Sequence, residues 1–290
     1  MTLPLVSHNS KQVKSFVDEY LRLHVSISVL NIFKSKDILL MMTISRMKII
    51  IFLIPVLYTV IALLIKIIYP SIYYVIIQED SVIEYLQAIV YFISALISLS
   101  ISIRFFRMHF ACESAKYLLH AILYSFLFMS LIFISIEEIS YGQRLFYIDT
   151  PEFFIEHNSQ HEITVHNLKF VQSVLHMIYI LVGLYGAMSW LLLRVINLPL
   201  NHIIQFIYVE WFISSYFLSV FLLYSYLDLI SRVIFKISQM KVFLVNGGFI
   251  VWRDQEPAEF LLSLGFLIFV VTKYYKSKAL CSGSVNKHAI

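Results

Sequence analysis

Long apolar runs, separated by short polar segments, constrain this chain more than any other feature. A run needs about 20 residues to carry a helix across the hydrocarbon core of a bilayer. Because backbone groups in lipid cannot bond to water, such runs cross as helices with internal hydrogen bonds. The sequence therefore predicts an all-α membrane protein, a bundle of about six transmembrane helices. The runs are residues 48–69, 83–103, 117–137, 170–193, 203–227 and 257–273.

Composition and charge agree with this class. The chain is 60% hydrophobic and 14% charged, against about 45–50% and about 25% for soluble domains. Lys and Arg gather before residue 49, between residues 104 and 116, at Arg194 and from Lys273 onward. Such residues mark the cytoplasmic side, so both termini are predicted to be cytoplasmic. The net charge of +4 follows from this topology and gives no support for nucleic-acid binding.

The same pattern divides the chain into three segments. Residues 1–46 are predicted to form a cytoplasmic arm, amphipathic or poorly ordered, and residues 277–290 a cytoplasmic tail. Residues 47–276 hold the six-helix transmembrane domain. Met41 and Met47 are among the methionines that precede the first apolar run, so a later start codon is an alternative account of the arm.

A polar segment interrupts the apolar pattern after the third run, from Ser140 to Lys169. Glu137 and Glu138 come just before it, at the C-terminal end of a predicted helix, where the helix dipole disfavours carboxylates. One explanation is an ion pair with Arg144 or Lys169. The other is a general acid/base or metal ligand at the membrane boundary, because ionisable groups at this depth are commonly functional. The residues leave both explanations open.

Glu84 and Glu259 stand near the starts of two other predicted helices on the same membrane face. Acids in a first helical turn complement the helix dipole. Ser81 with Glu84 has the spacing of a capping box, and Pro257 suits a first helical position. We therefore predict that these two glutamates cap helices.

The polar segment has local order of its own. Gly142 is a plausible helix stop. Residues 149–152, Asp-Thr-Pro-Glu, predict the start of a short interfacial helix with an apolar face at 153–155. Asn167 is a candidate cap for the fourth transmembrane helix, which would place it and His166 at the membrane level of the two glutamates.

Histidines at 157, 161 and 166, with Glu156 and Glu162, suggest zinc, whose ligands are imidazoles and carboxylates. The spacing from His161-Glu162 to His166 is one residue longer than the HExxH motif. An offset of five residues turns a side chain about 140° from its partner, against about 40° for an offset of four. No metal ligand is therefore assigned and the cofactor is left open, with His166 the best single candidate for zinc because the next helix fixes its position.

Other polar features are predicted to be structural. Gly183 and Gly186 suit close packing of the fourth helix. Glu210 and Asp228 bracket the fifth run, and His176 is expected to be a satisfied buried imidazole.

The connection between the fifth and sixth runs carries a turn signal. Residues 241–245 and 249–252 are apolar and flank Asn246-Gly247-Gly248. A small outer hairpin is predicted here, with an interfacial helix as the alternative.

A motif in the polar segment resembles a known family. The string EEISYGQR at 137–144 is followed by Thr150-Pro151-Glu152 and then by Asn158, Gln160, Glu162, His166 and Asn167. It is similar to the signature of a family of uncharacterised bacterial multi-spanning membrane proteins, in which an EEISWGQR-like motif precedes TPE and Q-x-E-x-x-x-HN patterns. The likeness covers most of residues 48–275. Tyr141 replaces the expected Trp, and His161 stands where a small residue is usual.

The resemblance implies a multi-pass protein of the bacterial inner (cytoplasmic) membrane and no particular reaction. The residues that it singles out are Glu137, Glu138, Gln143, Arg144, His166 and Asn167.

Two functions fit these residues. The first is a hydrolase or transferase acting on a lipid or lipid-linked substrate at the extracytoplasmic face. Glu137, Glu138 and His166 would be its acid/base residues, and Gln143, Arg144 and Asn167 would bind the headgroup. The second is a non-catalytic membrane subunit or small transporter in which the Glu-Arg-His cluster is structural. The sequence identifies no protein partner beyond the lipid bilayer.

Overall fold

The computed structural model describes residues 43–77, 81–143, 146–196, 204–230 and 254–285. These residues are mostly helical, as predicted, and none of them belongs to a strand. Contacts divide the chain into two compact units, Met1–Ile50 and Ile51–Ile290. In the first unit the described residues, 43–50, are helical, and the second unit contains all the other elements.

Several predictions lie outside the described residues. They are the arm up to residue 42, the side chain of Arg144, the hairpin at 241–252 and the last residues of the tail, 286–290.

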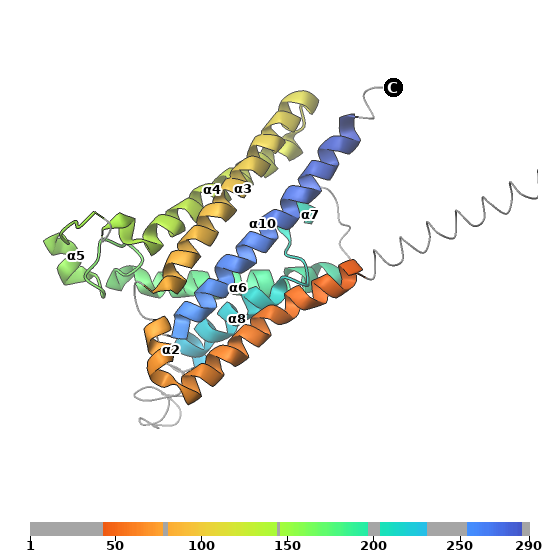
Figure 1. Ribbon diagram of the computed structural model, residues 1–290. Coiled ribbons are helices and arrows are strands. Elements are labelled where there is room, and N and C mark those ends of the chain that lie inside the picture. The colour runs from red at the N-terminus through yellow and green to blue at the C-terminus, as the bar shows by residue number, and fades with distance from the viewer. Residues whose placement is uncertain (1–42, 78–80, 144–145, 197–203, 231–253, 286–290) are drawn as a thin grey trace, which may run out of the picture. The chain divides into compact units, whose positions relative to one another are not determined.

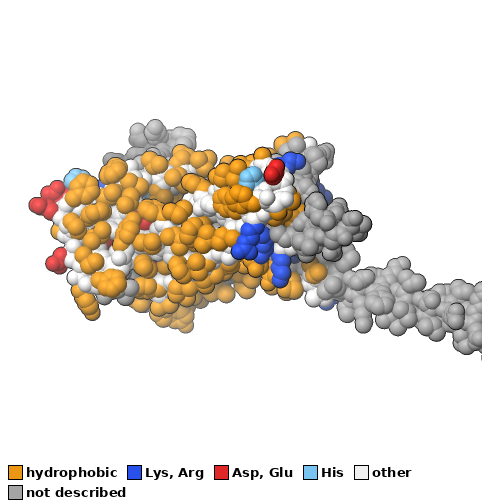
Figure 2. All heavy atoms as spheres, turned by 90° about the horizontal axis from the view of Figure 1, so that it is seen from above, with side chains coloured by type: hydrophobic (Ala, Val, Ile, Leu, Met, Phe, Trp, Pro, Cys, Tyr) orange, Lys and Arg blue, Asp and Glu red, His pale blue; other side chains and the backbone are white. Residues whose placement is uncertain are grey.

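Five helices in the described part of the chain are long and apolar enough to cross a bilayer. They are Thr43–Ile68, α3 (Val82–Cys112), α4 (Ala115–Glu138), α6 (Lys169–Val195) and the Gln255–Leu280 part of α10 (Gln255–Val285). Large apolar side chains are exposed along them, and Figure 2 shows a face that such side chains largely cover. The finding agrees with a multi-pass membrane protein.

The fifth predicted run is not one long helix. It consists of α7 (Ile204–Ile207), a turn at 208–213, α8 (Ser214–Tyr224) and a π-helix, η2 (Ser225–Ile230). The apolar composition of the run could not reveal this break, because residues far along the chain stabilise it, as described below. The last helix, in contrast, runs past the predicted boundary at residue 276 to Val285.

α3 and α4 form an antiparallel pair, with α10 packed along α3 (Figure 1). Their connection turns at Glu113, whose φ is 47°. Two serine hydroxyls join the helices: Ser102 donates to the carbonyl of Ala121 and Ser135 to that of Ala88, each at 2.8 Å. Small polar residues are a common contact between membrane helices.

α6 packs on α8 through two glycines, as the sequence predicted. A Cβ on Gly186 would lie 2.1 Å from Cγ of Phe217, and one on Gly183 would lie 2.8 Å from the backbone nitrogen of Phe221. Both distances are below any real contact, so only glycine allows this approach.

The core of the bundle contains several large aromatic side chains. Phe105, Tyr124, Phe206, Tyr216 and Phe217 are all buried in one cluster with aliphatic residues of the same helices. This packing holds α3, α4, α8 and α10 together and fixes which faces of these helices point inward.

The polar segment folds into short elements between α4 and α6. A 3-10 turn, η1 (Ser140–Gly142), follows α4, and α5 (Glu152–His157) forms where a short helix was predicted. The predicted cap of the next long helix is wrong, because α6 begins after Leu168 and has no side-chain cap.

Candidate functional site

The carboxylate of Glu137 is buried in the last turn of α4 and bonds to the segment before α6. Its Oε2 accepts hydrogen bonds from the backbone nitrogens of Val165 at 2.8 Å and His166 at 2.9 Å. The same oxygen lies 2.9 Å from Nδ1 of His166. These donors explain how a carboxylate is stabilised at the negative end of a helix dipole. The predicted ion pair with Lys169 is wrong, because Lys169 donates to the carbonyl of Glu156.

His166 is the partner that this arrangement positions. Its side chain is one-third exposed and lies between the membrane-spanning helices α4 and α6. Burial lowers the pKa of His166, but the hydrogen bond to Glu137 and the charges of Glu138 and Glu259 outweigh it, so the pKa lies above its usual value. The imidazole therefore stays protonated to higher pH than a free histidine.

A polar cavity of about 30 Å³ opens beside His166. Four carboxyl groups from three helices line it: Glu84 of α3, Glu138 of α4, and Glu256 and Glu259 of α10. The other lining residues are His166, Asn167, Gln160, Gln172, Leu175, His176, Tyr179, Tyr224 and Gln255. A space of this size holds one or two water-sized groups.

Hydrogen bonds hold several of these lining residues in place. The hydroxyl of Tyr224 donates to Oε1 of Glu259, and the ring of Tyr224 stacks on Tyr179 with centroids 4.6 Å apart. His176 lies 3.0 Å from Asp228, so it is a paired imidazole, as predicted, and it also lines the cavity.

The structure separates the sequence-predicted residues into two groups. Glu138, His166 and Asn167 line the cavity, whereas Glu137 contacts His166 and is not among the lining residues. Asn167 donates to the Gln160 side chain instead of capping α6.

Gln143 holds the polar segment together away from the cavity. Its amide nitrogen donates to Oγ1 of Thr150 at 2.6 Å, and its amide oxygen accepts from the backbone nitrogen of Ile163 at 2.7 Å. Because both ends of the amide are bonded to this segment, Gln143 acts as a brace.

Sequence reasoning missed the contributions of Glu84, Glu256 and Glu259. We interpreted Glu84 and Glu259 as helix caps, but Ser81 makes no side-chain capping bond, and both glutamates line the cavity. The sequence did contain one indication of these contributions. Glu84 lies near the start of α3, and Glu256 and Glu259 near the start of α10, on the membrane face where α4 ends at Glu138. Only packing shows that these ends meet.

The backbone between α4 and α5 is strained. Ser140, Tyr141 and Gly142 have φ values of 48°, 53° and 74°, in the left-handed region. A non-glycine residue in this region costs of order 1–3 kcal/mol and is found most often near functional sites. The hydroxyl of Ser140 donates to Glu162 at 2.5 Å, which helps to hold the turn directly after Glu138.

The other two histidines of the predicted zinc pattern bond to backbone carbonyls. Nδ1 of His157 lies 2.9 Å from the carbonyl of Phe153, and Nδ1 of His161 lies 2.7 Å from that of Ile155. Among the described residues, no group of three or more His, Cys, Asp or Glu is arranged to hold a metal ion.

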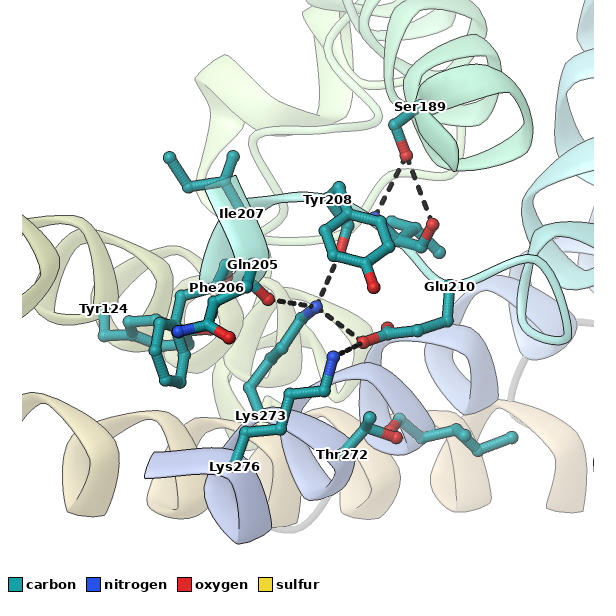
Figure 3. Close-up of polar contacts among 12 residues, drawn as sticks. Tyr124, Ser189, Gln205, Phe206, Ile207, Tyr208, Glu210, Thr272, Lys273 and Lys276 are labelled. Atoms are coloured by element: carbon teal, nitrogen blue, oxygen red, sulfur yellow. Dashed lines mark hydrogen bonds and ion pairs between the residues drawn. The ribbon is translucent and has the colours of Figure 1, made fainter. Parts of the chain in front are cut away.

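A second polar centre surrounds Lys273, farther along α10 (Figure 3). The side chain of Lys273 is fully buried and donates to the carbonyls of Gln205 and Tyr208, at 2.9 and 2.6 Å. It also pairs with Glu210 at 2.8 Å, and Lys276 reaches the same carboxylate at 2.6 Å. These bonds satisfy the carbonyls that the break between α7 and α8 releases, so Lys273 is part of the core of the bundle.

An apolar groove of about 340 Å³ lies between the helix Thr43–Ile68, α8 and α10. At one end of it, Lys66 pairs with Asp254 at 2.5 Å, and Tyr73 of α2 (Pro70–Ile76) donates to the same carboxylate at 2.8 Å. Asp254, Pro257 and Leu261 line the groove, whereas Glu256 and Glu259 line the polar cavity. By helical spacing these are opposite faces of α10, so the two sites are separate.

No known protein family, no curated protein and no solved structure matches this chain. Its class therefore follows from its own fold and site. It is a helical protein whose described residues include five helices suited to crossing a membrane, and carboxyl groups from three of these helices line a polar cavity at one end of the bundle.

Proposed function

We propose that this protein is a membrane-embedded hydrolase or transferase that acts on the polar headgroup of a lipid or lipid-linked substrate. The observation that carries the proposal is the pairing of Glu137 with His166, 2.9 Å apart, beside a cavity lined by Glu138. A carboxylate that orients an imidazole is a recurrent arrangement in acid/base catalysis.

The chemistry assigns one role to each residue. Glu137 is a positioning residue: it holds Nδ1 of His166 and leaves Nε2 to exchange a proton with the reactants. The protonated imidazole gives the proton on Nε2 to the leaving group. Glu138, in its ionised form, takes the proton of an attacking water in a hydrolase, or of an acceptor hydroxyl in a transferase.

The position of the cavity supports a lipid-borne substrate. Glu138 ends one apolar helix and Glu256 stands at the start of another, so the cavity is at the level where spans end. A substrate anchored in the bilayer would present its headgroup at this level. We further propose that this is the extracytoplasmic face of a bacterial inner membrane, with both termini on the other side.

A small transporter is the second candidate, and one observation favours it. The break between α7 and α8, with the buried Lys273–Glu210 pair beside it, has the form of the broken helices that build transporter sites. A transporter would require both polar centres for function, whereas the enzyme requires Lys273 for folding only.

Variants at the cavity test the enzyme. His166→Ala and Glu138→Gln are expected to abolish changes in lipid or lipid-linked species, measured by mass spectrometry of membranes from cells that produce each variant. The matched control is His157→Ala, which removes an exposed histidine of the same polar segment that does not line the cavity. If both cavity variants insert and fold normally and give the wild-type lipid profile, the enzymatic proposal is wrong.

A further inference from the structure

The apolar groove between the helix Thr43–Ile68, α8 and α10 has a length and a polar end that suit a lipid. We infer that it binds one acyl chain of a zwitterionic phospholipid, with the headgroup at the Lys66–Asp254 pair. The lipid comes from the leaflet on the side of the polar cavity, because Asp254 directly precedes α10 at that end of the bundle. The site is separate from the proposed reaction, since the groove and the polar cavity lie on opposite faces of α10.

The groove has the length of one bilayer leaflet. Apart from Tyr73, its described lining falls within residues 58–66, 219–226 and 254–261. At about 1.5 Å per residue, residues 58–66 extend about 12 Å. Half of the hydrocarbon core of a bilayer is about 15 Å thick. The groove therefore reaches from the membrane boundary, where the helices end, to about the middle of the membrane.

Contacts at both ends of the groove keep it open. At the deep end the rings of Tyr58 and Phe260 meet with centroids 6.0 Å apart, and at the other end Lys66 pairs with Asp254 at 2.5 Å. The first helix therefore cannot move onto α10 and close the space of about 340 Å³ between them. An unfilled apolar space loses dispersion contacts along its walls, so in a bilayer a hydrocarbon chain fills it.

The groove is continuous with the surface that faces the lipid. Leu63 and Leu222 line it, and their side chains are exposed together with those of neighbouring apolar residues on the same helices. A lipid chain can therefore enter sideways from the bilayer. A transmembrane helix of a partner would need a groove along the whole span, but beyond Tyr58 the ring of Phe52 contacts Trp211, with centroids 5.9 Å apart.

The charges at the polar end are complementary to a zwitterionic headgroup. Among the described lining residues, Lys66 carries the only ammonium and Asp254 the only carboxylate. Tyr73 donates to this carboxylate at 2.8 Å, so the pair has a fixed position at the membrane boundary. A zwitterionic headgroup offers a phosphate to the lysine and an amine to the aspartate, whereas a headgroup of net negative charge sets a like charge against Asp254.

Photolabelling at two depths tests this inference. The full chain would be placed in phosphatidylcholine nanodiscs that contain a small fraction of phosphatidylcholine with a diazirine, either next to the ester or at the end of one acyl chain. We expect the first probe to label peptides around Lys66 and the second to label peptides around Tyr58, because the groove orders the chain along its length. Labelling of the same segment by both probes would overturn the inference.

Variants that fill the groove connect the labelling to the site. Ala62→Trp puts a large ring into the groove and is expected to reduce labelling of residues 254–261 by about tenfold. The matched control is Leu64→Trp, at an exposed position of the same helix that is not among the lining residues. Ser219→Phe fills the groove from α8 and replaces Ala62→Trp if that variant does not fold, as thermal unfolding in detergent will show. Unchanged labelling in a folded variant that fills the groove contradicts the inference.

Native mass spectrometry identifies what occupies the groove. From nanodiscs with equal amounts of phosphatidylcholine and phosphatidylglycerol, we expect the wild type to retain one phosphatidylcholine and folded Ala62→Trp to retain none. Preferential retention of phosphatidylglycerol, or equal retention by both proteins, would show that the inference is wrong. A dimer that Ala62→Trp dissociates would assign the groove to a second copy of the chain instead.

Discussion

At the scale of single residues, Glu137 and His166 show how position decides what an acid does. Glu137 and Glu138 are neighbours in sequence, yet the first bonds to the chain and the second lines a cavity. Helical geometry turns successive side chains by about 100°, so adjacent glutamates cannot share one environment. Of the pair, Glu138 is the one that lines the cavity.

His166 gives a pH dependence at this scale. Its pKa is raised on folding, mainly through the hydrogen bond to Glu137, against the lowering caused by burial. Protonated His166 therefore stabilises the fold fully below the unfolded pKa of about 6.5, and this contribution is lost as the pH rises through the folded pKa. We expect thermal stability to fall over that window in the wild type but not in His166→Gln.

The pKa itself can be measured directly. NMR of protein labelled at histidine should show His166 titrating above the usual value, and Glu137→Gln should shift the titration to lower pH. A His166 titration that Glu137→Gln leaves unchanged would mean that this hydrogen bond does not control the proton.

At the scale of elements, the break between α7 and α8 depends on a lysine from α10. Lys273 satisfies two backbone carbonyls and a carboxylate at once. A buried carbonyl or carboxylate without a hydrogen-bond donor costs folding free energy. The break between α7 and α8 is therefore stable only because α10 supplies Lys273 as the donor.

Lys273→Met should destabilise the protein by about 3–5 kcal/mol, the usual cost of removing one partner of a buried ion pair. Glu210→Gln should cost less, because Lys273 keeps both carbonyl partners. Thermal unfolding in detergent measures both effects. Lys278→Met, at an exposed position of the same helix, is the control and should behave as the wild type.

The contact of α6 with α8 gives a second prediction about elements. Gly186→Ala would place a methyl group 2.1 Å from the Phe217 ring, and overpacking of this kind typically costs about 1–3 kcal/mol. Leu184→Ala, at an exposed site on α6, should cost less. If Gly186→Ala unfolds at the wild-type temperature, α6 and α8 do not approach as closely as described.

At the scale of the whole molecule, the ends of the helices place acids together and define two faces. The cavity gathers glutamates from α3, α4 and α10 at one end. The turn between α3 and α4, with Cys112 and Glu113, is at the other end of that helix pair. If α3 and α4 each cross the bilayer, these two regions lie on opposite sides.

Labelling of cysteines tests this arrangement. In a Cys281→Ser background, a membrane-impermeant thiol reagent should label an added cysteine, Glu152→Cys, from outside intact cells. Cys112, which is exposed, should react only after the membrane is opened. Labelling of both from the same side would contradict the proposed topology.

Hydropathy predicted the five long helices of the described residues because the requirement behind them is local: in lipid, each segment must satisfy its own backbone. Local sequence also predicted three further features: the short helix after residue 151, the close packing at Gly186 and the unusual position of two acids at the end of α4. The predicted caps at Ser81 and Asn167 were wrong. The hydrogen-bond partner of a polar side chain depends on which groups the folded chain brings near it, and local sequence does not show these groups.

The sequence by itself thus determined the helical class of this protein and the place where its polar residues interrupt the apolar runs. Tertiary structure alone decided that Glu84, Glu256 and Glu259 join Glu138 and His166 around one cavity, and that Lys273 completes a broken helix. The reason is physical. Which face of a helix meets which neighbour depends on packing between segments more than a hundred residues apart, such as α3 and α10, and no local pattern records it.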